Sequence, residues 1–382
     1  MTLRGSIAIV GTAESDLGAV APGLSPVDLM AQATHRALAD CGLQLSDVDG
    51  VFAAAGQLRV PTLTYCQYMG IQPRYSDSTV IGGSSFMAHV LHAMAAIRQG
   101  LCNVAVVVYG STQRSQGRSN VRREEYDPYE SPYRPWLPPT AYALATSRYM
   151  HEYGATRENL ADVAVAARQW ALLNPAAWEK KPLTRQEVLD SRMVCSPLSV
   201  RDCCLVTDGG GAIILTSAER AKDLRQKPAY VLGAGEALSH QNISNMANLT
   251  ETAAVHSGRR AYDMAGLSAA DVDVLELYDA FTITPILFLE DLGFCAKGEG
   301  ASFVGGGRIA PGGSLPVNTN GGGLSYCHPG MYGLLILIES ARQIQGVAGQ
   351  RQVSACDVAL AHGNGGYFSS QCTVLLGSEA TL

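Results

Sequence analysis

The chain has 382 residues, of which 16% are charged and 47% hydrophobic, and its formal net charge is −6. This length exceeds one small core and fits two packed α/β halves of roughly 150–200 residues each. The negative charge gives no support for binding to nucleic acid or to an anionic membrane surface, and no apolar run approaches the length of a membrane-spanning helix.

The cysteines indicate a reduced, cytoplasmic protein. Ten cysteines are scattered along the chain, and none forms a Cys-x-x-Cys pair. This pattern is typical of free thiols in a reducing compartment. The eight histidines show no metal-ligand spacing with cysteine or aspartate, so the sequence predicts no metal site. The apolar stretch over residues 7–10 is too short for a signal sequence and is expected to be a strand.

The first third of the chain alternates strand and helix signals. Strands are predicted over residues 6–11, 48–55, 78–81 and 103–109. A helix over 25–41 is predicted because Ser25 can act as N-cap and Pro26 occupies the first helical position. A second helix is expected between Gly83 and Gln99. This alternation predicts a mostly parallel sheet.

Residues 111–205 break the alternation. This stretch is rich in tyrosine, proline and arginine, and two amphipathic helices are predicted in it, near 140–153 and 158–173. Long insertions of this kind often cover an active site or build an interface. It contains a basic cluster that is either an anion-binding site, a solvated loop or a subunit contact: Arg114, Arg118, Arg122 and Arg123.

The alternation resumes in the second half. Residues 205–217 return to the sheet, and further strands are predicted over 229–233, 272–277, 358–360 and 372–377. Helices are predicted over about 250–266, from about 284, and over 330–345. The chain is therefore expected to contain two similar α/β halves, residues 1–220 with the inserted loop domain at about 111–205, and residues 221–382.

Four motifs place polar groups beside tight turns. Residues 318–330 form a glycine-rich loop that contains His328 and Pro329. Residues 278–281 read Tyr-Asp-Ala-Phe and follow the apolar strand at 272–277. Residues 362–366 read His-Gly-Asn-Gly-Gly, whose glycines allow backbone to lie close to a ligand. Residues 82–85 read Gly-Gly-Ser-Ser and precede a helix.

These motifs resemble those of thiolases, enzymes that make or break carbon–carbon bonds beside an acyl-CoA thioester. Tyr278 stands where the thiolase Asn-Glu-Ala-Phe motif has asparagine, and His362 stands where the family has its second cysteine. The nucleophilic cysteine is replaced by Gly82 or Gly83. The resemblance covers the whole chain. It implies two pseudo-equivalent βαβαβαββ halves in a five-layer αβαβα arrangement, with the site between them.

The resemblance also implies roles for individual residues. His328 is expected to bind the thioester oxygen, where negative charge develops. Tyr278 and Tyr326 are candidates for general acid and base, and His362 for a proton-transfer role. The alternatives are that both phenols only pack and that His362 only anchors its turn. Further substrate-binding candidates are Gly83, Ser84, Ser85, Asp279, Gly322, Gly323, Asn364 and Gly365.

Two interpretations of the Gly-Gly-Ser-Ser segment remain. Ser84 or Ser85 replaces the thiol as nucleophile, which requires an adjacent base. Alternatively, the segment is a tight turn and N-cap that leaves open space where the thiol was. The second is expected, because a hydroxyl is a poor partner for thioester exchange.

Loss of the thiol makes acyl transfer unexpected, whereas retro-aldol cleavage of a β-hydroxyacyl-CoA needs only proton transfer and enolate stabilisation. The chain is similar to thiolase-like aldolases (lipid-transfer proteins) of bacterial steroid side-chain degradation. That similarity implies a steroid ketone and a short acyl-CoA, such as propionyl-CoA or acetyl-CoA, as products, with no covalently bound cofactor. It also implies a homodimer within a heterotetramer that includes an OB-fold and zinc-ribbon partner. The alternatives are an acyltransferase with another nucleophile and a non-catalytic acyl-CoA or lipid-binding subunit.

Overall fold

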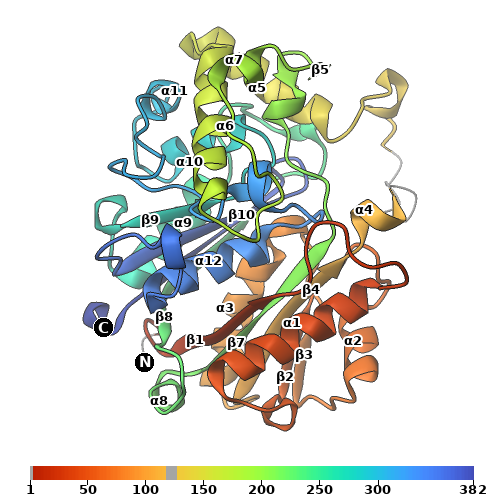
Figure 1. The fold of residues 1–382 in the computed structure, drawn as a ribbon, viewed down its shortest axis with the longest axis vertical. Coiled ribbons are helices and arrows are strands. Elements are labelled where there is room, and N and C mark those ends of the chain that lie inside the picture. The colour runs from red at the N-terminus through yellow and green to blue at the C-terminus, as the bar shows by residue number, and fades with distance from the viewer. Residues whose placement is uncertain (1–2, 118–126) are drawn as a thin grey trace.

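A computed structural model describes residues 3–117 and 127–382 (Figure 1). Its main sheet has the strand order β3-β2-β4-β7-β1-β8-β11-β10-β9. The strands of this sheet are β1 Ile7–Glu14, β2 Gly50–Ala53, β3 Tyr75–Asp77, β4 Val104–Ser111, β7 Gly209–Ser217, β8 Ala229–Leu238, β9 Val274–Leu277, β10 Val358–Gly365 and β11 Ser370–Gly377.

The α-helices include those that the sequence predicted. They are α1 Pro26–Cys41, α2 Pro61–Met69, α3 Ser85–Arg98, α4 Gln113–Gln116, α5 Pro139–Tyr153, α6 Arg157–Leu172, α7 Arg185–Leu189, α8 Ala218–Ala221, α9 Ala254–Ala265, α10 Ile283–Asp291, α11 Gly300–Phe303 and α12 Gly333–Gln345. No helix within the described ranges is long and apolar enough to span a membrane.

The helix α1 shows how the local sequence sets an element. Ser25 and Asp28 form a capping box at its start, and Pro26 occupies the first turn. Gly42 ends the helix in a left-handed conformation with φ of 80°. The predicted bounds of this helix are therefore confirmed.

The layers follow from which strands each helix contacts. The helices α3 and α12 contact strands of both parts of the sheet and form the central layer. On the outer faces, α1 covers β1, β4 and β7, whereas α9 covers β8 and β11 (Figure 1). The strands of both parts are buried along almost their whole length. This is the five-layer αβαβα arrangement expected from the sequence.

The sheet is mixed, so the prediction of a mostly parallel sheet was wrong. Only the pairs β2–β3, β2–β4 and β9–β10 are parallel among the described strands. The strand β7 enters antiparallel between β4 and β1, and β11 returns antiparallel beside β10. The predicted strand at 78–81 is also absent. There the N–H groups of Thr79 and Ile81 donate to the side chains of Asp77 and Ser85, at 2.8 and 2.9 Å, instead of to a neighbouring strand.

The strands β1 and β8 join the two parts of the sheet through the pairs Ala8–Tyr230 and Ile9–Ala229. The inserted segment forms α5–α7 and a small two-stranded sheet, β5 Met193–Cys195 and β6 Leu198–Ser199, at one end of the molecule (Figure 1). It supports the glycine-rich loop directly, because Arg168 Nε lies 3.0 Å from Ser325 Oγ and Asn174 Nδ2 lies 2.8 Å from the Asn320 carbonyl. Of the basic cluster, Arg118, Arg122 and Arg123 lie outside the described residues.

His92 on α3 links the two parts of the sheet. Its Nδ1 lies 2.5 Å from Asp77 Oδ2 on β3, and its Nε2 lies 3.8 Å from Glu236 on β8. The hydrogen bond from His92 lowers the pKa of Asp77, and the same contact raises the pKa of His92. Stabilisation by Asp77 is present above its unfolded pKa of 3.8, and stabilisation by His92 is present below its unfolded pKa of 6.5.

We therefore predict that the His92→Asn substitution destabilises the fold most between pH 3.8 and 6.5. The loss shrinks as the pH rises through the raised pKa of His92 in the folded state. Denaturant unfolding of the two proteins near both pH 6 and pH 9 checks this. His35→Asn, at an exposed site on α1, is the control. An equal loss at both pH values would exclude the charged pair.

Candidate active site

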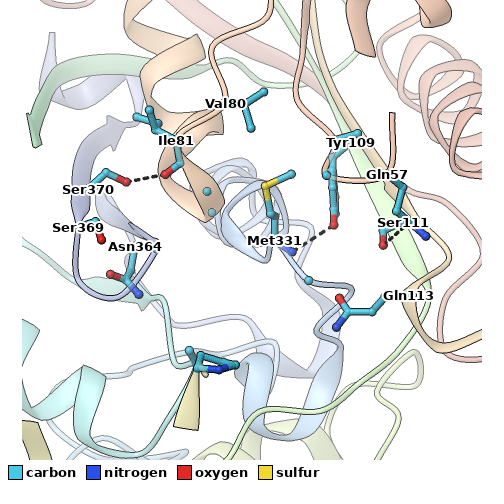
Figure 2. Close-up of a pocket in the computed structure, with 18 of the residues that line it drawn as sticks. Gln57, Val80, Ile81, Tyr109, Ser111, Gln113, Met331, Asn364, Ser369 and Ser370 are labelled. Carbon is cyan, nitrogen blue, oxygen red and sulfur yellow. Dashed lines mark hydrogen bonds between the residues drawn. The ribbon is translucent and has the colours of Figure 1, made fainter. Parts of the chain in front are cut away.

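A cavity of about 2880 Å³ lies where the two halves and the inserted segment meet. Figure 2 shows one wall with Asn364, Ser369 and Ser370 and the opposite wall with Tyr109 and Gln113. The predicted site residues that line it are Gly83, Tyr278, His328 and Asn364. The cavity is larger than the roughly 300–1,000 Å³ of most small-molecule sites. It therefore has room for a bulky substrate.

Tyr278 and His328 form the polar centre of the cavity. Tyr278 follows β9, and His328 follows a short π-helical turn at Gly322–Tyr326. The Tyr278 hydroxyl lies 3.1 Å from His328 Nε2, and it accepts a hydrogen bond of 3.0 Å from the N–H of Tyr332, which caps α12. With that acceptor position filled, the phenolic proton can point to the imidazole or to the Gly330 carbonyl, which lies 3.4 Å from the hydroxyl. The structure thus brings two of the candidate site residues into contact.

Burial sets the protonation states of this pair. Desolvation raises the pKa of Tyr278 well above its usual value of 10, and the N–H of Tyr332 opposes that rise. Desolvation also lowers the pKa of His328 to about 4. At neutral pH the site therefore holds a protonated phenol against a neutral imidazole. A neutral imidazole is able to accept a proton.

The space expected to be open beside Gly83 is filled by Tyr278. A Cβ atom added at Gly83 would lie 2.1 Å from Tyr278 Cε2 and 2.7 Å from the Asn364 carbonyl oxygen. A side chain at residue 83 and the ring of Tyr278 therefore exclude one another. Gly82 has φ of 80° and faces the backbone of Gly365 instead. The expectation of open space was wrong, because the phenol occupies it.

Ser84 and Ser85 do not line the cavity. Ser84 Oγ donates to the Ile81 carbonyl at 3.0 Å and contacts Ser370 Oγ at 2.5 Å. Ser85 Oγ donates to the Gly82 carbonyl at 2.6 Å and accepts from the Ile81 N–H at 2.9 Å. Neither hydroxyl has a histidine or carboxylate as hydrogen-bond partner among the described residues. Their contacts are those of a turn that starts α3.

We predict that Ser84→Ala and Ser85→Ala each retain turnover within a few-fold of the unsubstituted protein. Each change removes buried hydrogen bonds, so each is expected to lower stability by about 1–3 kcal/mol. Steady-state rates at a temperature where both variants are folded, together with denaturant unfolding, check this. A loss of turnover of 100-fold or more in either variant would restore the serine nucleophile.

Asp279 holds the glycine-rich loop and lies outside the cavity lining. Its carboxylate accepts the N–H groups of Gly323 at 2.6 Å and Leu324 at 3.2 Å. Desolvation raises its pKa to about 7, although these N–H groups oppose the rise. A Cβ at Gly322 would lie 1.9 Å from the same carboxylate. Asp279, Gly322 and Gly323 thus shape the loop that carries His328 and do not contact the cavity.

Tyr326 points away from the cavity. Its hydroxyl donates to Glu14 Oε1 at 2.9 Å, and Arg342 binds both oxygens of that carboxylate at 2.6 Å. Glu14 lies at the end of β1 and Arg342 lies on α12. The structure therefore places Tyr326 in a link between the two halves, which corrects its expected position at the reacting centre.

His362 is also buried away from the cavity. Its Nδ1 lies 2.9 Å from Thr373 Oγ1 and its Nε2 lies 2.9 Å from Gln371 Oε1. Two residues further along β10, Asn364 reaches the cavity wall. Gly365 lies behind that wall, where a Cβ would meet the Ile81 carbonyl at 1.8 Å. The expected place of His362 at the reacting centre is corrected, because it lies two positions before Asn364 on β10 and does not line the cavity.

Tyr142 of the inserted segment is a cavity residue that no motif indicated. Its ring stacks on Phe281 with centroids 4.3 Å apart, and its hydroxyl accepts from Asn364 Nδ2 at 2.8 Å. A tyrosine on an amphipathic helix carries no sequence signal for function. Within the described residues, no group of three or more histidine, cysteine or acidic side chains is arranged to hold a metal ion.

Comparison with known proteins identifies the family. Residues 235–378 match the family described as Thiolase C-terminal domain-like. The 17-hydroxy-3-oxo-4-pregnene-20-carboxyl-CoA lyase of Mycobacterium tuberculosis is 35% identical over 91% of this chain and 93% of its own length. The steroid side-chain-cleaving aldolase of Thermomonospora curvata is 32% identical over 95% of this chain and 96% of its own.

Solved structures agree with these relatives. The Ltp2-ChsH2(DUF35) aldolase superposes with a TM-score of 0.90 at 31% identity and covers 99% of both chains. Human mitochondrial 3-ketoacyl-CoA thiolase, at 16% identity and a TM-score of 0.73 over 99% of this chain and 100% of its own, shares the fold. The chain therefore belongs to the thiolase superfamily, as a member of its group of steroid side-chain-cleaving aldolases.

Proposed function

We propose that this protein cleaves a β-hydroxyacyl-CoA on a steroid side chain to a steroid ketone and a short acyl-CoA, such as propionyl-CoA or acetyl-CoA. The observation that carries the proposal is the Tyr278 phenol, which occupies the space beside Gly83 and contacts His328 at 3.1 Å. Gly83 is one of the two positions at which the resemblance to thiolases expects the lost cysteine, and the group beside it is a phenol that suits proton transfer. The named activities of the two curated relatives support the same reaction class.

In the proposed reaction a proton is relayed from the β-hydroxyl to His328 through Tyr278 and is later returned to Cα. The β-hydroxyl proton passes to the phenolic oxygen of Tyr278 while the phenolic proton passes to His328 Nε2. The Cα–Cβ bond breaks, its electron pair forms the thioester enolate, and Cβ becomes the ketone carbon. The enolate stabilises the imidazolium beside it. The proton then returns through the phenol to Cα, which gives the short acyl-CoA.

A partner protein is part of the proposal. The aldolase structure with a DUF35 partner matches this chain over 99% of its length. We propose that the chain forms a homodimer within a heterotetramer that includes an OB-fold and zinc-ribbon partner. The ten cysteines, all free in the structure, suit action in the reducing cytoplasm.

Mass spectrometry of the co-expressed complex after incubation with a steroid β-hydroxyacyl-CoA tests the reaction. We expect a steroid ketone and a free short acyl-CoA in equal amounts, with no mass added to the chain. A covalent acyl adduct would instead support the acyltransferase alternative and would locate its nucleophile. Tight binding of the CoA thioester without any product would support the non-catalytic alternative.

A further inference from the structure

We propose that Tyr142 is a second catalytic phenol of this site, which donates a hydrogen bond to the thioester oxygen as the enolate forms. We propose further that His362 is its positioning residue, acting through Gln371 and Asn364. The inference rests on the proposed retro-aldol reaction and assigns its oxyanion donor to Tyr142 in place of His328, whose Nε2 takes the phenolic proton in that reaction. It also gives His362 a function from its buried position.

Tyr142 is fixed at the cavity wall by contacts on both its ring and its hydroxyl. The side chain is only 2% exposed, and the ring stacks on Phe281 at 4.3 Å and packs against Phe368 at 4.6 Å. The hydroxyl accepts from Asn364 Nδ2 at 2.8 Å and donates to the Gly366 carbonyl at 3.1 Å. Figure 2 shows Asn364 on the wall that borders the cavity.

A buried chain of hydrogen bonds orients Asn364. Its Oδ1 accepts from Gln371 Nε2 at 2.8 Å, and Gln371 Oε1 lies 2.9 Å from His362 Nε2. Because an amide oxygen only accepts, His362 must carry its proton on Nε2. Thr373 Oγ1 lies 2.9 Å from the other ring nitrogen. All these side chains are 2% exposed or less.

The hydrogen bonds from His362 to Tyr142 all point in one direction, and this determines which bond the Tyr142 hydroxyl can still donate. Each link donates toward the cavity, from His362 to Gln371, to Asn364 and then to the Tyr142 oxygen. The phenolic proton is therefore left for an acceptor in front of the ring. In the structure that acceptor is the Gly366 carbonyl, and a substrate oxygen is able to replace it. Burial raises the pKa of Tyr142, which keeps the phenol protonated and ready to donate at neutral pH.

Asn364 connects Tyr142 to the Tyr278 side of the cavity. Its Nδ2 donates to the Tyr142 hydroxyl, and its carbonyl oxygen and the Tyr278 ring both border the space at Gly83. Both phenols line the cavity. One is paired with an imidazole that accepts a proton, and the other accepts from an amide, so the first suits proton transfer and the second suits hydrogen-bond donation.

Tyr142→Phe in the co-expressed complex tests the oxyanion role. We expect kcat to fall on the order of 10²–10³-fold, the usual effect of removing one oxyanion donor, with KM changed only a few-fold. The control is Tyr153→Phe on the same helix, whose ring is 37% exposed and which does not line the cavity. Turnover of Tyr142→Phe within three-fold of this control would overturn the assignment.

His362 is tested by a pair of substitutions and a double-mutant cycle. His362→Gln keeps a side-chain N–H for Gln371 and is expected to retain most of the turnover, whereas His362→Leu is expected to lower kcat at least ten-fold. Because His362 acts through Tyr142, adding His362→Leu to Tyr142→Phe should cost no further turnover. Additive losses would overturn the positioning role. If His362→Leu fails to fold, Asn364→Ser breaks the same chain and takes its place in the cycle.

The outcomes separate this inference from the proposed reaction. If the unsubstituted complex and Tyr153→Phe release ketone and acyl-CoA but Tyr142→Phe is unaffected, only the inference fails. If the unsubstituted complex releases no ketone, the proposed reaction fails and the inference fails with it. The assignment stands only if the unsubstituted complex is active and Tyr142→Phe loses turnover while remaining folded.

Discussion

Tyr278→Phe is expected to lower turnover by about 10²–10⁴-fold while the protein stays folded. The substitution keeps the ring that packs against Gly83 and removes only the hydroxyl. That hydroxyl makes the polar contact with His328 Nε2, at 3.1 Å. Without it, the β-hydroxyl proton has no route to the imidazole. Because the step lost is chemical, kcat should fall much more than KM rises.

The same substitution has a predictable cost in stability. The N–H of Tyr332 donates to the Tyr278 hydroxyl at 3.0 Å and would lose its acceptor in a buried place. We expect a loss of about 1–3 kcal/mol in the free energy of unfolding. Rates are therefore compared at a temperature where denaturant unfolding shows both proteins fully folded. Near-normal turnover in folded Tyr278→Phe would remove this residue from the mechanism.

Gly83→Ala is expected to lower turnover by about 100-fold or more and to destabilise the fold by about 1–3 kcal/mol, as overpacking typically does. The added Cβ would lie 2.1 Å from Tyr278 Cε2. Either the phenol leaves its contact with His328 or the turn before α3 shifts. Both changes break the geometry that proton transfer needs.

A double substitution tests whether the Tyr278 ring causes the destabilisation by Gly83→Ala. Adding Tyr278→Asn to Gly83→Ala removes the clash with the ring and leaves the 2.7 Å approach to the Asn364 carbonyl, so the stability should return in part while turnover does not. This recovery is a coupling energy between two residues in contact. Gly56→Ala, whose Cβ would meet open space, is the stability control. Equal destabilisation of the single and double variants would show that Tyr278 does not fill the space beside residue 83.

The clash at residue 83 also affects whether a cysteine can stand at this turn. Gly82 and Gly83 are the two positions at which the resemblance to thiolases expects the cysteine, and at Gly83 the Sγ of a cysteine would need the volume of the Tyr278 ring. The phenol and the thiol are therefore alternatives at one position in space, although they come from residues 195 positions apart in the sequence.

The sequence by itself determined the family, the order of most elements and the four motifs. Strong local signals account for this success, such as the capped start of α1 at Ser25 and Pro26 and the valine run of β4. These signals depend on neighbouring residues only, so they can be recognised in the sequence without the fold. The mixed sheet could not be predicted, because insertion of β7 between β4 and β1 depends on contacts across more than a hundred residues.

Only the tertiary structure decided which motif residues meet. His362 and Asn364 lie on the same face of β10, but a strand advances about 3.3 Å per residue. Those two residues of separation, roughly 6–7 Å, leave Asn364 at the wall and His362 inside. Tyr326 and His328 are equally close in sequence, yet one binds Glu14 and the other binds Tyr278. Motifs fix which groups are available, whereas side-chain direction within a few ångströms fixes which of them reach a substrate.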